Sequence, residues 1–90
     1  MSEYEWDEKK RLSNLRKHGL DLLDANVLFD GRPIFTDDAR SDVEQRFKTI
    51  GVVSGALRTL IWTWREERRR FISFRSARDE EKRNYGQLHR

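Results

Sequence analysis

The residues with the clearest chemical potential are four cations on, or at the ends of, predicted strands. Arg46 and Lys48 share one face of a strand predicted over residues 44–53. Arg65 ends the next strand, and Arg75 ends the last one. In a meander of antiparallel strands these side chains can converge on one face or one edge of the sheet. Clustered guanidinium groups bind phosphate through paired hydrogen bonds and stabilise charge that develops on phosphorus, so the pattern predicts a phosphodiester site.

RNA is a phosphodiester that such a site could cut without a metal ion. Its 2′-hydroxyl supplies the nucleophile, so the protein needs to orient the chain, transfer protons and stabilise charge. Tryptophan and tyrosine rings can stack on an unpaired base, and Trp6 is the candidate for this contact. These residues fit a metal-independent ribonuclease and a non-catalytic nucleic-acid-binding regulator equally well. Each arginine also has a purely structural alternative, a salt bridge to Glu44, Glu66 or Glu67.

Residue types that bind metals or cofactors are scarce in this chain. It has two histidines, His18 and His89, and no cysteine, and it lacks a glycine-rich phosphate loop and a nucleophile elbow. The acidic segment 37–44 could offer carboxylates to a divalent cation, but such loops are usually only solvated. We therefore expect neither a metal ion nor a cofactor.

Charge is distributed unevenly along the 90 residues. Residues 1–57 carry 9 Lys and Arg against 11 Asp and Glu, whereas residues 58–90 carry 10 against 5, and the net charge is +3. A basic C-terminal third indicates an anionic partner, either nucleic acid or an acidic protein segment. Since no apolar run is long enough to span a bilayer and the acidic N-terminus does not resemble a signal peptide, we expect a soluble cytoplasmic protein without a membrane partner.

The hairpin predicted over residues 57–78 organises the rest of the chain. Leu60, Trp62 and Trp64 alternate with polar and β-branched residues, which is the period of a strand lying on a core. An all-charged connection follows over residues 65–70, and an aromatic run resumes at Phe71. We expect the aromatic residues to form the core and the arginines to serve the function.

The remaining pattern predicts an α+β protein, a single domain over residues 1–90. We expect Asp7 to cap a first helix that buries Leu12 and Leu15 and ends at Gly19, and Asp21 to cap a second helix. The predicted elements are strand 3–6, helix 7–17, helix 20–29, strands 44–53, 57–65 and 71–75, and helix 76–85, with a short strand or extended edge at 34–36 and a frayed tail over 87–90. This order, β-α-α-β-β-β-α, corresponds to helices packed on a small antiparallel sheet.

The chain also resembles a known family over residues 6–85. The matching residues are Trp6-Asp7, Lys10, Asn14, Lys17-His18-Gly19, Ala25, Phe29-Asp30, Glu44-x-Arg46, Gly51, Thr63-x-Arg65, Arg70-x-Ile72-Ser73-x-Arg75, Ala77, Glu81 and Tyr85. In this order and spacing they resemble the BrnT toxins of type II toxin–antitoxin systems. Leu22, Phe74 and Ser76 depart from the family pattern without removing a polar candidate.

The resemblance implies a RelE-like fold and an endoribonuclease that cuts RNA and inhibits translation. It implies a cognate BrnA-type antitoxin with a ribbon-helix-helix domain. We expect a complex of two toxins and two antitoxins that binds the promoter of the operon. The candidate catalytic residues are Arg65, Arg75, His18, Lys48 and Tyr85, and the candidate RNA-binding residues are Arg46, Arg70, Arg78 and Trp6.

Overall fold

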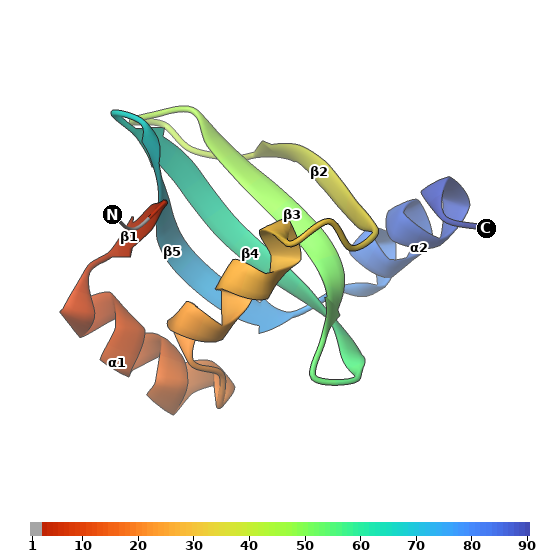
Figure 1. Ribbon diagram of the computed structural model, residues 1–90, viewed down its shortest axis with the longest axis horizontal. Helices are drawn as coiled ribbons and strands as arrows, with labels where there is room; N and C mark the ends of the chain where they lie inside the picture. The colour runs from red at the N-terminus through yellow and green to blue at the C-terminus, as the bar shows by residue number, and fades with distance from the viewer. Residues whose placement is uncertain (1–2) are drawn as a thin grey trace.

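The computed structural model describes residues 3–90; Met1 and Ser2, where the predicted domain starts, lie outside the described residues. Its elements are β1 (Tyr4–Trp6), α1 (Glu8–His18), the 3₁₀ helix η1 (Leu22–Phe29), β2 (Ile34–Ala39), β3 (Arg46–Val53), β4 (Ala56–Arg65), β5 (Arg68–Ser76) and α2 (Asp79–Leu88). The strands form one sheet in the order β1-β5-β4-β3-β2 (Figure 1). The α+β class predicted from the sequence is confirmed.

The sheet is mixed, which corrects the prediction of a small antiparallel sheet. β1 runs parallel to β5, with Tyr4 paired to Arg69, while the other neighbouring strands are antiparallel. The sequence could not reveal this direction because the two strands lie more than 60 residues apart and no hairpin joins them. The edge strand β2 extends to Ala39, so the loop predicted from residue 37 begins later; acidic side chains are tolerated on an exposed edge.

Both predicted N-terminal caps of the first two helices are confirmed. The Asp7 carboxylate accepts a hydrogen bond from the Lys9 amide at 2.8 Å, and Gly19 ends α1 in the left-handed conformation with φ 69°. Asp21 caps η1 by accepting from the Leu23 amide at 3.0 Å. The second helix is 3₁₀, and its three residues per turn place Leu22, Ala25 and Leu28 on one buried line.

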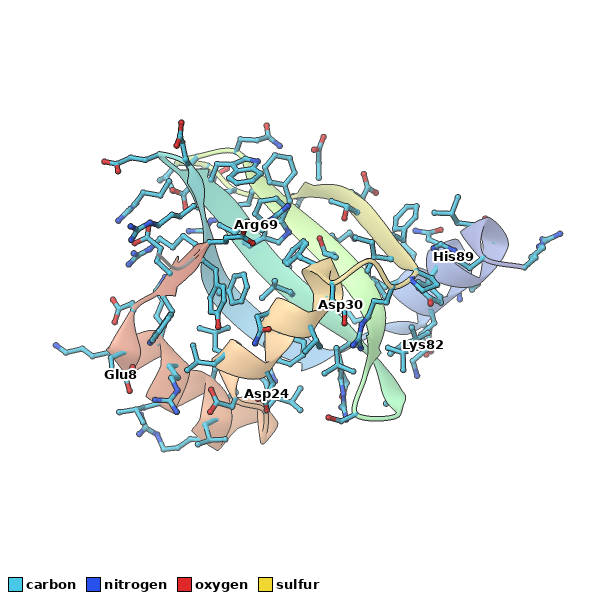
Figure 2. The ribbon with its side chains drawn as sticks, in the orientation of Figure 1. Glu8, Asp24, Asp30, Arg69, Lys82 and His89 are labelled. Carbon is cyan, nitrogen blue, oxygen red and sulfur yellow. The ribbon has the colours of Figure 1, made fainter. Side chains whose placement is uncertain are left out.

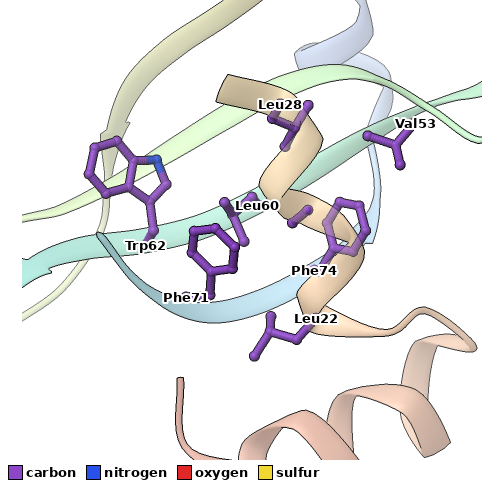
Figure 3. Close-up of a cluster of buried hydrophobic side chains, with 8 residues drawn as sticks. Leu22, Leu28, Val53, Leu60, Trp62, Phe71 and Phe74 are labelled. Atoms are coloured by element: carbon purple, nitrogen blue, oxygen red, sulfur yellow. The ribbon is translucent and has the colours of Figure 1, made fainter. Parts of the chain in front are cut away.

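The hydrophobic core lies between η1 and one face of the sheet, which we call the core face. Its buried cluster is Leu22, Ala25, Leu28, Val53, Leu60, Trp62, Phe71 and Phe74 (Figure 3). Gly51 lets η1 approach closely, because a Cβ there would lie 2.7 Å from a Leu28 methyl carbon. Trp64, predicted to face the core, is 49% exposed because β4 extends past η1 into the hairpin.

The first helix buries a polar residue instead of its leucines. Leu12 and Leu15 are 46% and 45% exposed, contrary to the prediction, whereas Asn14 is 6% exposed. The Asn14 side chain donates to the Phe74 carbonyl at 2.8 Å and accepts from the Phe74 amide at 2.9 Å. It therefore pairs with the outer edge of β5 beyond the point where β1 ends, and α1 lies beside the sheet edge more than over its core.

A β-bulge in β5 determines which side chains reach which face. Ile61 pairs with Ser73 but Trp62 pairs with Phe71, so Ile72 is an extra residue in β5. Phe71 and Phe74 consequently point to the core face although they are three residues apart, and Arg75 points to the opposite face. We call this second face the α2 face because α2 packs on it.

The charged connection in the hairpin is shorter than predicted. Glu66 and Glu67 make the turn, with Glu66 at φ 58°, and β5 already begins at Arg68. Charged residues are accommodated inside β5 because they find partners on neighbouring elements. Arg70 donates to Glu5 at 3.0 Å, and the Arg69 guanidinium lies over the rings of Phe29, Trp62 and Trp64 at 4.0, 5.2 and 4.9 Å.

The last helix begins and ends later than predicted. Arg78, not Ser76, occupies the N-cap position, and α2 continues through Gly86 to Leu88. Of the tail predicted to fray over residues 87–90, Gln87 and Leu88 belong to α2. His89 Nε2 lies 2.7 Å from the Ile34 carbonyl oxygen, where α2 passes the start of β2 (Figure 2). Within residues 3–90, none of the helices is long and apolar enough to cross a membrane.

Candidate functional site

The α2 face of the sheet brings a lysine and an arginine from separate strands to one buried carboxylate. Lys48 on β3 and Arg75 on β5 flank β4, whose Thr59 and Ile61 point to the same face. Glu81, in the first turn of α2, is 3% exposed. The three charged residues come from segments that are remote in the sequence and meet where α2 begins.

Glu81 is the centre of this arrangement because both of its oxygens are engaged. Arg75 donates to the two carboxylate oxygens at 2.8 and 3.0 Å, and Lys48 Nζ lies 3.7 Å from Oε2. The Thr59 hydroxyl and the Arg78 amide donate to Oε1 at 2.9 and 2.8 Å. The carboxylate thus fixes the position of the Arg75 guanidinium and draws Lys48 toward it.

These contacts determine the charge state of Glu81. Burial alone would raise the pKa of the carboxyl group, but hydrogen bonds from Arg75, the Arg78 amide and Thr59 outweigh it and lower the pKa to about 2. The group is therefore ionised near neutral pH. With its lone pairs occupied, Glu81 acts as a positioning residue and is a poor proton acceptor.

An open cleft of about 350 Å³ lies beside this ion cluster, and we call it the α2 cleft. It is bounded by residues 38–40 at the end of β2, Lys48, Ile61, Arg75, Arg78 and Glu81. An anion that enters the cleft would meet Lys48, Arg75 and Arg78. The geometry therefore suits a phosphate group whose charge is shared among several cations.

A second concavity, the α1 groove, lies on the other side of β5. Its volume is about 220 Å³, and it is lined by Lys10, Ser13, Lys17 and His18 of α1 and by Ile72 and Ser73 of β5, with Asn14 at its inner side. Partial burial and the charges of Lys17 and Arg75 lower the pKa of His18 below its usual value. His18 is therefore biased toward the neutral form, as a proton acceptor requires.

Metal-binding residues do not gather in the part of the chain that the structure describes. No group of three or more histidine, aspartate or glutamate residues among residues 3–90 is arranged to hold a metal ion. The charged groups that line the α2 cleft are instead the Lys48 ammonium group, the guanidinium groups of Arg40, Arg75 and Arg78, and the carboxylates of Asp38 and Glu81.

Residues 6–81 match a protein family described as the ribonuclease toxin BrnT of type II toxin–antitoxin systems. The chain belongs to the BrnT family. No curated protein matches it. A BrnT toxin is a ribonuclease that has a cognate antitoxin.

Two of the five predicted catalytic residues of this BrnT chain, Lys48 and Arg75, meet in the α2 cleft. Arg78, predicted to bind RNA, lies there too. Arg65 does not join them: Arg75 pairs with Thr59, and Arg65 lies six residues further along β4, roughly 20 Å away at the rise of a strand. The structure thus separates two arginines that we expected at one phosphate.

Tyr85 also lies away from the α2 cleft. Its hydroxyl is 3.4 Å from the Pro33 carbonyl oxygen, and its ring packs on His89 near the start of β2. Tyr85 is one helical turn beyond Glu81, in the direction that leads away from Arg75. His18 lies in the α1 groove, where the positive charge of Arg75 contributes to lowering its pKa.

The predicted RNA-binding residues divide between the two faces. Arg46 and Arg70 lie on the α2 face beyond Lys48, paired with Glu44 and Glu5 at 3.0 Å each. Trp6 lies on the core side, where its ring nitrogen donates to Glu8 at 2.8 Å. The predicted salt bridge to Glu44 is therefore formed by Arg46.

Sequence reasoning gave Glu81 no role, although it matched the BrnT pattern. A usable signal was present, because an acidic residue in the first turn of a helix often binds backbone amides at the helix start. That signal did not reveal Arg75 and Lys48 as its partners, since their approach depends on the packing of α2 against the sheet.

Proposed function

We propose that the α2 cleft cleaves single-stranded RNA without a metal ion, by attack of a 2′-hydroxyl on the adjacent phosphorus. The observation that carries the proposal is the convergence of Lys48 and Arg75 on Glu81 at the edge of an open cleft. Because Glu81 holds the Arg75 guanidinium before substrate arrives, little reorganisation is needed when charge builds on the phosphate.

The proposed reaction is a transesterification with balanced proton transfers. The 2′-oxygen forms a bond to phosphorus, the bond to the 5′-oxygen breaks, and the products are a 2′,3′-cyclic phosphate and a 5′-hydroxyl. Arg75 and Lys48 stabilise the phosphorane charge, and Arg78 contributes to phosphate binding. His18, at the end of the neighbouring α1 groove, is the proposed acceptor of the 2′-hydroxyl proton, with Lys48 as the alternative proton-transfer group. The leaving 5′-oxygen takes one proton from solvent water, so the proton count balances. Neither Arg65 nor Tyr85 is part of this proposal.

The mechanism is tested with purified protein and RNA in the presence of EDTA. We expect cleavage to persist and the products to end in 2′,3′-cyclic phosphate. Lys48→Ala should lower the rate by roughly 10²–10³, as expected for loss of a group that stabilises transition-state charge. Lys82→Ala, an exposed lysine of the same helix as Glu81, serves as the matched control and should cut RNA normally.

Two results would remove the proposal. Intact RNA in EDTA with activity restored by magnesium would exclude a metal-free mechanism. Salt-sensitive RNA binding without cleavage under any condition would favour the regulator that uses the same basic face.

We also propose that the RelE-like topology, inhibition of translation and a cytoplasmic setting apply to this chain, as its family resemblance implies. A ribbon-helix-helix antitoxin of the BrnA type would neutralise it in a complex of two toxins and two antitoxins. Mass measurement of the co-expressed pair tests the stoichiometry. In a gel shift the complex should bind the promoter of its operon, and the isolated toxin should not.

A further inference from the structure

The α1 groove presents unneutralised positive charge along one side of a helix. Ser13 and Lys17 follow Lys10 by three and seven residues, so the three side chains lie on one face of α1. Within residues 3–90 neither Lys10 nor Lys17 forms an ion pair, whereas Arg11, on the neighbouring face, pairs with Glu8 and Asp21 at 2.8 and 3.0 Å. The cations that face the groove are therefore available to an external anion.

The far wall of the groove, formed by Ile72 and Ser73 of β5, leads toward the α2 cleft. Ser73 lines the α1 groove, and Arg75, two residues further along β5, lines the α2 cleft. The charge of Arg75 acts on His18 at the end of the groove. The two concavities are thus neighbours across one strand, and a flexible polyanion could occupy both.

Asn14 excludes one competing occupant, a peptide that adds to the edge of β5. A peptide added as a strand needs free backbone amide and carbonyl groups along that edge. The Asn14 side chain already binds both backbone groups of Phe74 and also donates to the Leu20 carbonyl at 3.0 Å. The groove consequently offers side-chain cations and hydroxyls, and no free strand edge at this position.

We infer that the α1 groove binds the phosphate backbone of the same single-stranded RNA, on one side of the phosphate held in the α2 cleft. Lys10 and Lys17 lie about 10 Å apart along the helix axis, so they can contact separate phosphates of one strand. Ser13 can donate to a phosphate oxygen, whereas the Ser73 hydroxyl donates to Asn14 Oδ1 at 3.4 Å. The inference rests on the proposed function for the position of the cut, but the binding itself can be measured separately.

The experiment measures binding of a mixed-sequence, 2′-O-methyl RNA of about eight nucleotides over a range of salt concentrations, because this RNA lacks the nucleophile of the proposed reaction. For the variant Lys10→Ala/Lys17→Ala, the dissociation constant should rise. The slope of log affinity against log salt should fall by about 1.4, the value for two lost phosphate contacts to a single strand. The matched control Lys9→Ala/Arg16→Ala removes two cations from other faces of α1 and should leave the slope unchanged.

Each outcome separates this inference from the proposed function. Equal slopes in the wild type and Lys10→Ala/Lys17→Ala, or an equal loss in both double variants, would overturn the groove as a site. If only the affinity for an acidic antitoxin peptide fell, the groove would belong to the partner protein and the inference would be wrong. If wild-type protein cut no RNA while the slope changed as expected, the groove would stand and the cleavage proposal would fail. Should the alanine variant melt early, Lys10→Gln/Lys17→Gln keeps most of each side chain and tests the same charges.

Discussion

The ion pair between Arg75 and Glu81 is both part of the α2 cleft and part of what holds α2 on the sheet. Glu81 is almost fully buried, and 15% of the Arg75 side chain is exposed. Removing one member of a buried pair leaves the other charge without its partner, which generally costs more than the pair contributes when intact. We expected the aromatic residues to form the core and the arginines to serve the function. Arg75 has a structural role as well, because it pairs with buried Glu81.

We predict that Arg75→Ala lowers the free energy of unfolding by about 3 kcal/mol, the lower end of the usual range for a broken buried pair. The lower end applies because Thr59, the Arg78 amide and Lys48 still face Glu81. Urea denaturation measures the change. The control is Arg65→Ala, which is exposed and should stay within about 0.5 kcal/mol of wild type. Equal stability of the two variants would show that the pair contributes nothing.

Acid should weaken the protein through Glu81 in a defined pH window. The folded-state pKa of about 2 is below the ordinary value of 4.5, so the unfolded chain binds the proton more readily. The stabilisation is fully present above about pH 4.5 and is lost as the pH falls toward 2. Between these values Glu81→Gln should make the dependence of stability on pH shallower, by at most about 1.4 kcal/mol per pH unit. Melting curves from pH 6 to 2 measure the slope, and parallel curves for the two proteins would contradict the assignment.

Among the elements, α1 is attached to the sheet chiefly through one polar side chain. Asn14 takes the place that a neighbouring strand would have beside Phe74. Asn14→Ala would leave a buried amide and a buried carbonyl without partners, at a cost of roughly 1–3 kcal/mol for each group that water does not reach. Hydrogen exchange should show a larger loss of protection at the Phe74 amide than at Leu60 in the middle of β4. Equal losses at both amides would mean that Asn14 stabilises only the whole fold.

The contact between η1 and β3 depends on the small size of Gly51. Gly51→Ala would place a methyl group 2.7 Å from Leu28 and 3.1 Å from Ile34, so we expect overpacking to cost about 1–3 kcal/mol. Gly86→Ala is the matched control, because its methyl group would meet nothing within 4 Å inside α2. That variant should gain roughly 0.5–1 kcal/mol, since alanine is the better helix former. Thermal unfolding compares the two, and a stable Gly51→Ala variant would show that η1 can shift outward.

Local signals in the sequence were sufficient for many elements. Asp7 and Gly19 delimit α1 correctly, and Ser54-Gly55 makes the predicted turn, with φ of 52° and 80°. The signals failed where distant residues decide. The bulge at Ile72, the parallel pairing of β1 and the extension of α2 past Gly86 all depend on contacts between remote segments.

The candidate site shows the same limit. Lys48 and Arg75 could be selected by charge and strand position, and they do meet in the α2 cleft. Residue type alone could not distinguish Arg65, which is at the other end of the sheet, from Arg75. The alternation of a strand gives the face of a side chain, but the distance along the sheet depends on register.

In the whole molecule, α2 covers the face of the sheet opposite to the hydrophobic core cluster. The buried cluster lies on the core face, while Thr59 and Ile50 are buried on the α2 face. We predict that a chain ending at Ala77 keeps Trp62 in an apolar environment, with blue-shifted fluorescence, but melts earlier and does not cleave RNA. An unfolded shortened chain would show that the core face is not sufficient, and full activity would exclude Glu81 from the site.

Because β1 pairs with β5, the sheet cannot be completed until most of the chain has been synthesised. At roughly 5–20 residues per second, about 3 to 13 s separate the addition of Tyr4 from the addition of its partner Arg69. Glu81 follows later still, and without it neither Arg75 nor Lys48 has the partner that positions it. A nascent chain that lacks Glu81 therefore lacks the carboxylate that positions Lys48 and Arg75 beside the α2 cleft.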